Sequence, residues 1–378
     1  MTGNQPPAHP CAGGILFANM RFLHMADCHV GCRQYGMKER EEDFYRALET
    51  VRELAKSEKV DAVVIAGDLF DSPKPPSRAV YEVRRFVDDL EKNGIEVLGV
   101  EGNHDLTGSG YWLRVCGVWP LALMHRDVNG CRFVGCDYER SDQLLDSIEG
   151  RIENADVLVL HAGFVEMGDS FNSDLSAEAV SKLVRDRGVK YVATGHIHIP
   201  MEQVHDGILF VQPGSLEMKS LDEPQDKSVQ IVDYDVLEHK VSSVRRVPYA
   251  TRQVHFVNID TAEDIDRMVS EVTAEKVGGR FVVAYVSASV DGGLSRVEDW
   301  LRSEGLMFRA VPTGDRSDVG EKGYDRSNAM VSLKDAVDAF FEEDDERHAL
   351  VMAILATNNV RQVVEDFLNG KEKNDDQN

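Results

Sequence analysis

The sequence predicts an α/β protein with a second, smaller α+β domain, and two observations support this fold class. Short apolar runs of strand length alternate with segments whose apolar residues recur at helical spacing. This alternation ends near residue 250 and starts again at Arg252. Repeated strand–helix–strand units imply parallel strands joined by right-handed crossovers. We therefore expect a parallel sheet in the first domain.

The first domain is expected to contain the following elements in order. Its first half has strands at residues 20–25, 60–66 and 95–100, with helices at 39–56 and 77–92 between them. After a less regular stretch come strands at 131–135, 157–160 and 191–194, with a helix at 176–187. Two further apolar runs, at 208–212 and 228–235, are expected to close the domain as antiparallel strands.

The second domain is expected to be strand, helix, strand, helix, strand. Thr261 and Asp264 form a capping pair at the start of its first helix, and Gly278 and Gly279 stop that helix. The chain is thus divided into a disordered leader (1–19), a main domain (20–250), a smaller domain (251–313), a polar linker (314–328) and a helical segment (329–370). That last segment is too small for a core of its own, so its apolar stripes are expected to pack on another surface, either within this chain or on a partner.

Composition excludes some classes of protein. The 378 residues include no apolar run long enough to span a membrane, and the N-terminus has no basic head typical of a signal peptide. None of the six cysteines has C-x-x-C spacing, so a reducing cytoplasm is the expected compartment. The formal charge of −24 argues against a protein that holds DNA by its global electrostatics alone.

Potential metal ligands follow the expected strands. The motifs are D-x-H, G-D-x-x-D, G-N-H-D, an isolated histidine and G-H-x-H, which contain Asp27, His29, Asp68, Asp71, Asn103, His104, Asp105, His161, His196 and His198. Each motif alone is more often part of a turn or of the surface than of a metal site. Five such motifs in order, each after an expected strand, are unlikely to occur by coincidence. Since the carboxyl ends of parallel strands line one rim, the motifs are expected to share a site. Carboxylate, imidazole and amide ligands without thiolates favour manganese or iron-type ions over structural zinc, and manganese is the first choice.

A pair of metal ions needs a bridging ligand, and Asp68 is the candidate. Two ions about 3.5–4 Å apart clamp the attacking and leaving oxygens of a displacement at phosphorus. Water would be the nucleophile, and a nearby imidazole would give a proton to the leaving oxygen. The sequence therefore predicts a two-metal phosphoesterase.

The ordered motifs resemble the calcineurin-like metallophosphoesterase superfamily. Within it the chain is similar to the SbcD-type double-strand-break repair nucleases, through LHMADCHVG, DAVVIAGDLFD, EGNHD, GHIHIP and VQPGSLE. The resemblance implies a β-sandwich flanked by helices, with a capping domain and a C-terminal helix-loop-helix. It also implies that one metal is bound by Asp27, His29, Asp68 and His198, and the other by Asp68, Asn103, His161 and His196. His104 would contact the scissile phosphate and assist the leaving group, with Asp105 as its orienting partner.

The resemblance also suggests an activity and partners. The resemblance implies 3′–5′ exonuclease and endonuclease activity on DNA ends. Relatives work as homodimers with an SbcC-type coiled-coil ATPase, which the segment 329–370 would bind. Three departures stand out. Glu101 stands where relatives often have proline and places a negative charge near the phosphate path, and Asp71 stands where some relatives carry a histidine that assists the catalytic one. The third is the strong negative charge of the chain. The alternatives are hydrolysis of a small phosphoester such as a cyclic nucleotide, and a non-catalytic scaffold with a residual metal site.

Overall fold

The computed structural model describes residues 19–167 and 175–313. The expected linker and helical segment, and all but the last residue of the expected leader, lie outside these ranges. Within the described ranges, no helix combines the length and apolar character needed to cross a membrane.

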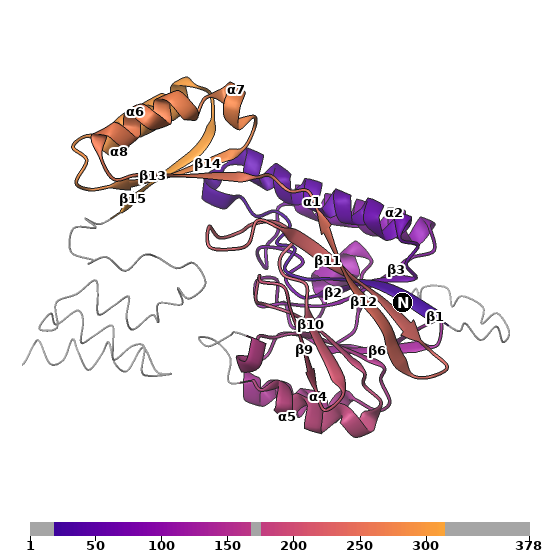
Figure 1. Cartoon of the computed structure of the whole chain (residues 1–378). Helices are drawn as coiled ribbons and strands as arrows, with labels where there is room; N and C mark the ends of the chain where they lie inside the picture. The colour runs from indigo at the N-terminus through magenta and orange to yellow at the C-terminus, as the bar shows by residue number, and fades with distance from the viewer. Residues whose placement is uncertain (1–18, 168–174, 314–378) are drawn as a thin grey trace, which may run out of the picture. The chain divides into compact units, whose positions relative to one another are not determined.

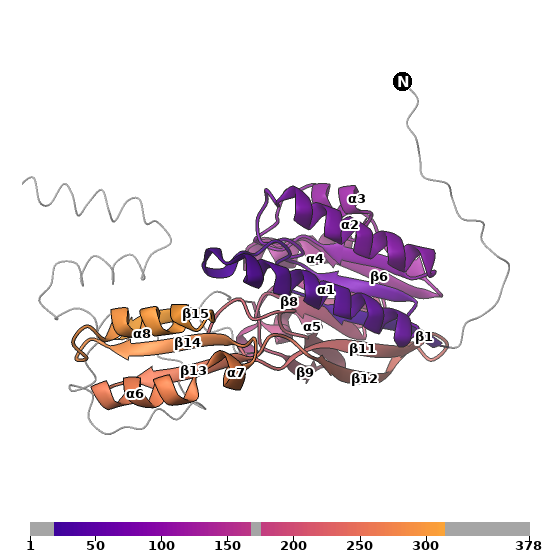
Figure 2. The same ribbon diagram turned by 90° about the horizontal axis from the view of Figure 1, so that it is seen from above.

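The first sheet has six strands in the order β12-β11-β1-β2-β3-β4. The strands are β1 (Asn19–Met25), β2 (Ala62–Ala66), β3 (Glu96–Val100), β4 (Trp119–Pro120), β11 (Lys227–Asp235) and β12 (Lys240–Tyr249). Neighbours from β1 to β4 are parallel, whereas β11 is antiparallel to both β1 and β12. Apolar faces of α1 (Lys38–Ser57), α2 (Ser77–Lys92) and α3 (Tyr111–Cys116) form a core with residues of this sheet such as Val63 and Ile65. Figure 2 shows α1 and α2 side by side.

The second sheet has the order β5-β6-β7-β8-β10-β9. Its strands are β5 (Arg126–Val128), β6 (Cys131–Cys136), β7 (Val157–His161), β8 (Tyr191–Gly195), β9 (Met201–His205) and β10 (Ile208–Gln212). Helices α4 (Ser141–Arg151) and α5 (Ala177–Val184) pack on its outer face (Figure 1). Short 3₁₀ turns occupy Gln34–Gly36, Val165–Met167 and Arg185–Arg187.

The two sheets face each other across a shared apolar layer. Phe22 of β1 packs edge-to-face on Phe133 of β6 and Tyr191 of β8, with both pairs of ring centroids 5.4 Å apart. The fold class, an α/β sandwich flanked by helices, is thereby confirmed. The expected parallel strands are present, from β1 to β4 and from β6 through β7 and β8 to β10, but they divide between two sheets, each with antiparallel strands at one or both edges. The strand β10 is also parallel to β8 and antiparallel only to β9, while β11 is antiparallel as expected.

Beyond β12 the chain forms a three-stranded sheet in the order β13-β14-β15. Its elements are β13 (Val254–Ile259), α6 (Ala262–Glu271), α7 (Ala274–Val277), β14 (Phe281–Ser287), α8 (Gly293–Ser303) and β15 (Met307–Thr313). Thr261 and Asp264 form the expected capping box at the start of α6. The expected single helix up to Gly278 is interrupted, because α6 ends at Glu271 and Thr273 caps the separate helix α7. The division of the chain at residues 250 and 313 stays a prediction.

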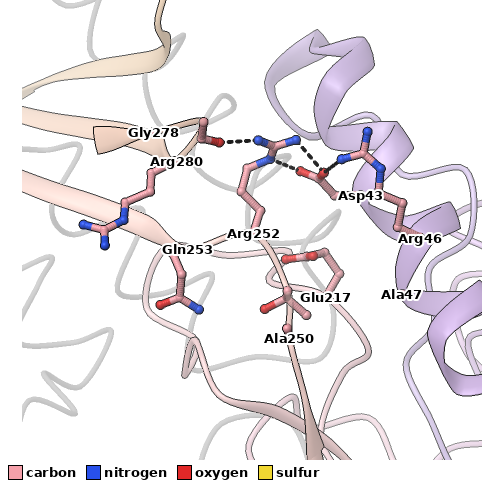
Figure 3. A pocket seen from close by; sticks show the side chains of 11 residues that line it. Asp43, Arg46, Ala47, Glu217, Ala250, Arg252, Gln253, Gly278 and Arg280 are labelled. Atoms are coloured by element: carbon pink, nitrogen blue, oxygen red, sulfur yellow. Dashed lines mark hydrogen bonds and ion pairs between the residues drawn. The ribbon is translucent and has the colours of Figure 1, made fainter. Parts of the chain in front are cut away.

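A buried ion-pair network lies where the chain leaves β12. The guanidinium of Arg252 donates to both carboxylate oxygens of Asp43 on α1, at 2.6 and 2.8 Å, and also to the carbonyl oxygen of Gly279. Asp43 is 3% exposed and also accepts from the fully buried Arg40, at 2.7 Å. Figure 3 shows Arg252 between Asp43 and the Gly278 loop, at the edge of a cavity of about 400 Å³. One buried carboxylate thus ties α1 to the start of the smaller sheet.

Candidate metal centre

Five strand ends bring the expected ligands together. The first sheet contributes Asp27 and His29 after β1, Asp68 after β2 and Asn103 after β3, while the second contributes His161 at the end of β7 and His196 and His198 after β8. Parallel strands place their carboxyl ends at the same edge of a sheet. The sandwich therefore lets both sheets supply ligands to one site.

The backbone at this edge is bent into conformations that are uncommon for residues other than glycine. Positive φ angles occur at Asp27 (50°), His29 (43°), Asp68 (48°) and His196 (90°). Such conformations cost about 1–3 kcal/mol each, and they cluster at functional sites. Gly67 precedes Asp68, and a Cβ atom on it would lie 2.2 Å from Nδ1 of His161. The close approach of the two sheets therefore requires glycine at this position.

One group of ligand atoms surrounds the end of β1. Nε2 of His29 lies 3.1 Å from Nε2 of His198 and 3.7 Å from Oδ2 of Asp68. Nε2 of His198 lies 3.9 Å from Oδ1 of Asp27. Asp27, His29 and His198 form one of three groups of histidine and acidic side chains in the described ranges whose atoms are close enough to hold a cation. The four residues that the resemblance assigns to one metal thus lie together.

A second group lies around Asn103. Its Oδ1 atom is 3.0 Å from Nε2 of His161 and 3.0 Å from Nδ1 of His196. Nε2 of His161 is 3.4 Å from Oδ2 of Asp68. The same Asp68 oxygen is therefore within 4 Å of an imidazole nitrogen of each group. That is the position a bridging carboxylate would occupy.

The contacts behind the ligands fit a metal site. Nδ1 of His161 lies 2.8 Å from the carbonyl oxygen of Ala66, and Nδ1 of His198 lies 2.6 Å from Oε1 of Glu223. A ring nitrogen that donates a proton to such an oxygen leaves the other nitrogen free as a ligand. In both residues it is Nε2 that faces the other ligands. The donor set and its outer contacts therefore suit divalent cations.

Burial and opposite charges set the protonation of the site. Burial alone would raise the pKa of Asp68, but the charge and the hydrogen bond of His161, together with the N–H group of His104, bring it well below the usual range. Burial alone would lower the pKa of His161, but the carboxylates of Asp68 and Asp27 raise it to about 9. Burial lowers the pKa of His29 to about 4. These pKa directions favour an ionised Asp68 and a neutral His29, as metal ligands must be, and a cation bound at His161 would release a proton from that ring.

His104 stands at the open side of the site, with 38% of its side chain exposed. Its Nδ1 atom is 3.2 Å from the carbonyl oxygen of Asp71. Asp105 is buried, and its two carboxylate oxygens accept the N–H groups of Phe70 and Gly102 at 3.0 and 2.8 Å. Burial raises the pKa of Asp105 to about 7. Any influence of Asp105 on His104 therefore passes through the loop, while Asp71 contacts the ring.

The structure adds two residues that sequence reasoning did not identify. Glu223 holds His198, and Lys219 pairs with Asp71, its Nζ atom lying 2.9 Å from Oδ1. Both follow β10 in a loop without periodicity, and only the preceding motif VQPGSLE pointed to this region.

One expectation about the loop after β3 is wrong. Glu101 is 1% exposed, and its carboxylate accepts the N–H groups of Thr107 and Gly108. The negative charge is thus directed into the loop and buried there. It organises the segment that carries His104 and does not face an incoming phosphate.

Comparisons with known proteins agree with this geometry. Residues 20–200 match the calcineurin-like phosphoesterase family. The DNA double-strand break repair protein Mre11 of Archaeoglobus fulgidus is 30% identical over 329 residues, which cover 79% of this chain and 70% of that protein. The Mre11 proteins of Aeropyrum pernix and Haloferax volcanii are 28% and 29% identical, covering 75% and 80% of this chain and 71% and 69% of theirs. The chain therefore belongs to the Mre11/SbcD-type DNA double-strand-break repair proteins of the calcineurin-like phosphoesterase family.

Proposed function

We propose that this chain is a two-metal phosphodiesterase that cleaves DNA at double-strand breaks, as an exonuclease and endonuclease. The observation that supports it best is the shared position of Asp68, whose Oδ2 atom lies 3.7 Å from Nε2 of His29 and 3.4 Å from Nε2 of His161. Two divalent cations sharing that carboxylate would stabilise charge on both the attacking and the leaving oxygen of a phosphodiester. Manganese is the proposed ion.

The proposed ligand sets follow the two groups around Asp68. Asp27, His29, Asp68 and His198 would hold one ion, and Asp68, Asn103, His161 and His196 the other. Glu223 would keep Nε2 of His198 directed at its ion, because it lies 2.6 Å from Nδ1 of that ring. Loss of such an outer contact commonly lowers metal affinity or activity about 10- to 100-fold.

His104 is proposed to protonate the leaving oxygen. Its ring is on the exposed side of the site, and Nδ1 lies beside the carbonyl oxygen of Asp71. Nδ1 would donate to that carbonyl oxygen, so the proton passed to the leaving oxygen would be the one on Nε2 of the doubly protonated ring. Asp71 would orient this ring directly, and Asp105 would do so through the loop.

The proposed assembly includes DNA, a second copy of the chain and an SbcC-type coiled-coil ATPase in the cytoplasm. Support for these partners comes from the family, whose curated members are double-strand break repair proteins. The segment 329–370 is the proposed ATPase-binding part. Hydrolysis of small phosphoesters is the competing function, and an appended second domain favours the larger substrate.

The test compares the wild type with His104→Asn on linear duplex DNA in the presence of Mn²⁺. We expect release of nucleotides by the wild type and a loss of about 100-fold or more in the variant, since a positioned acid commonly contributes that much. His125→Asn, at an exposed histidine, is the matched control and should be as active as the wild type. Equal activity of His104→Asn and the wild type, or turnover of cyclic nucleotides but not DNA, would contradict the proposal.

A further inference from the structure

Lys219 places a fixed positive charge beside His104. Its Nζ atom lies 2.9 Å from Oδ1 of Asp71, 3.1 Å from Nδ1 of His29, and 3.4 and 3.3 Å from Nδ1 and Nε2 of His104. The ammonium group therefore contacts both rings, and the double variant described below separates its action through His104 from any action through His29. The nearly equal distances to both ring nitrogens mean that the ammonium group lies alongside the ring and is not bonded to one nitrogen alone. Asp71 therefore contacts the ring through its carbonyl oxygen and holds the ammonium through its carboxylate.

Hydrogen bonds from the buried side chains of Gln34 and Arg40 hold the backbone at Lys219 in place. Nε2 of Gln34 donates to the carbonyl oxygen of Lys219 at 2.6 Å, and Oε1 of Gln34 accepts from Nε of Arg40 at 2.8 Å. Arg40 is fully buried and also donates to the carbonyl oxygen of Met218 at 2.8 Å. Such a network costs much to disturb, because each buried polar group would lose its partner. The loop therefore holds the start of the lysine side chain, and Asp71 holds its end.

We propose that Lys219 is a positioning residue for His104, which keeps the ring at the angle from which it reaches the leaving oxygen. The inference rests on the proposed function, because it acts through the proton that His104 donates. Without Lys219, the ring of His104 loses the ammonium group beside it, and the carboxylate of Asp71 loses its counter-ion. Oδ1 of that carboxylate already lies 3.3 Å from Nδ1 of His29 and 4.0 Å from Nδ1 of His104, so without the ammonium group these two rings alone would hold it.

Two substrates with different leaving groups separate this role from others. A DNA 3′-oxygen needs a proton to leave, whereas p-nitrophenolate leaves as a stable anion. The experiment measures kcat and KM of the full chain with Mn²⁺ on linear duplex DNA and on bis(p-nitrophenyl) phosphate. We expect Lys219→Met to lower kcat on DNA about 10- to 100-fold, with KM and hydrolysis of the nitrophenyl ester changed less than about threefold. Lys219→Arg, which keeps the charge, should recover part of the loss.

A second comparison uses the His104→Asn background. If Lys219 acts through His104, adding Lys219→Met to His104→Asn causes no further loss, because the two residues act as one unit. Lys182→Met, at an exposed lysine, is the control. The melting temperature and the Mn²⁺ affinity measured by calorimetry show that each variant is folded and loaded, and Lys219→Gln replaces Lys219→Met if that variant does not fold.

The outcomes are distinct. Equal slowing of both substrates, additive losses in the double variant, or unchanged activity of Lys219→Met would each overturn the inference while leaving the proposed function intact. A wild type that binds Mn²⁺ but hydrolyses neither phosphodiester would refute the proposed function, and the inference with it.

Discussion

Gly102 is a position where one added methyl group tests the proposed centre. A Cβ atom built there would lie 2.1 Å from Oδ1 of Asp68 and 2.3 Å from its backbone nitrogen. Ordinary contact begins at about 3.4 Å, so the carboxylate or the loop must retreat by more than 1 Å. Gly102 is not among the residues with positive φ, so alanine fits the backbone there and the conflict is steric.

The expected cost of Gly102→Ala falls on function more than on folding. A misplacement of about 1 Å at a reacting centre costs about 100-fold in rate, while overpacking costs about 1–3 kcal/mol of stability. The hydrogen bond from the N–H of His104 to Oδ1 of Asp68, 2.8 Å long, is disturbed as well. We therefore expect Mn²⁺-dependent nuclease activity to fall at least 100-fold, with weaker Mn²⁺ binding by calorimetry.

The matched control for Gly102→Ala is Gly150→Ala. No atom lies within 4 Å of a Cβ built at Gly150, which is in helix α4. Alanine in a helix is about 0.5–1 kcal/mol more favourable than glycine, so this variant should gain slight stability and keep full activity. Wild-type Mn²⁺ affinity and activity in Gly102→Ala would refute the placement of Asp68 at the centre.

Two further predictions concern stability and are measured by urea unfolding. Burial lowers the pKa of His24 in the folded protein to about 3, whereas this histidine takes up a proton near pH 6.5 in the unfolded chain. Protonation therefore favours the unfolded chain, and the free energy of unfolding falls as the pH drops below 6.5. The loss of stability caused by His24 amounts to about 2 kcal/mol by pH 5. Between pH 7 and pH 5, His24→Gln should therefore lose about 2 kcal/mol less stability than the wild type. Equal losses in both proteins would contradict the burial argument. Arg252→Met should cost about 2 kcal/mol, because it removes charged hydrogen bonds to buried Asp43. Arg302→Met breaks only an exposed pair and should cost less than about 0.5 kcal/mol, and equal costs would refute the role of burial.

Local signals in the sequence were sufficient for most helices and strands. Helix α2 has the expected bounds, 77 and 92, because its amphipathic pattern begins after Pro76 and ends before Asn93 and Gly94. The capping box of Thr261 and Asp264 formed for the same reason. The split into two sheets was not predictable in this way, because strands such as β2 and β7 are buried on both faces and have the same apolar character. Which strands pair depends on contacts between residues distant in the sequence.

The residues of the candidate site also separate into those that local sequence signals predict and those that depend on long-range contacts. The ligand-type residues were identifiable because they follow strands, and the end of a strand has a definite place in a sheet. Glu223 and Lys219 were not, since their place depends on how a loop without periodicity folds back to His198 and His29, which follow β8 and β1. Asp105 was misjudged in its contacts, because the sequence shows that it neighbours His104 but not that its carboxylate turns to Phe70 and Gly102.

The acidic composition of the chain and the proposed action on DNA are compatible because charge acts locally. Asp27 and Asp68 are 0% and 2% exposed, and two divalent cations held there would exceed the charge of these two carboxylates. Lys219 adds a fixed positive charge at the same opening. Exposed charges more than about 8 Å away are largely screened at physiological salt, so most of the surface carboxylates contribute little to the field at a bound phosphate. The charge of −24 therefore opposes long-range attraction of DNA, which a partner would have to supply, but it does not oppose chemistry at the centre.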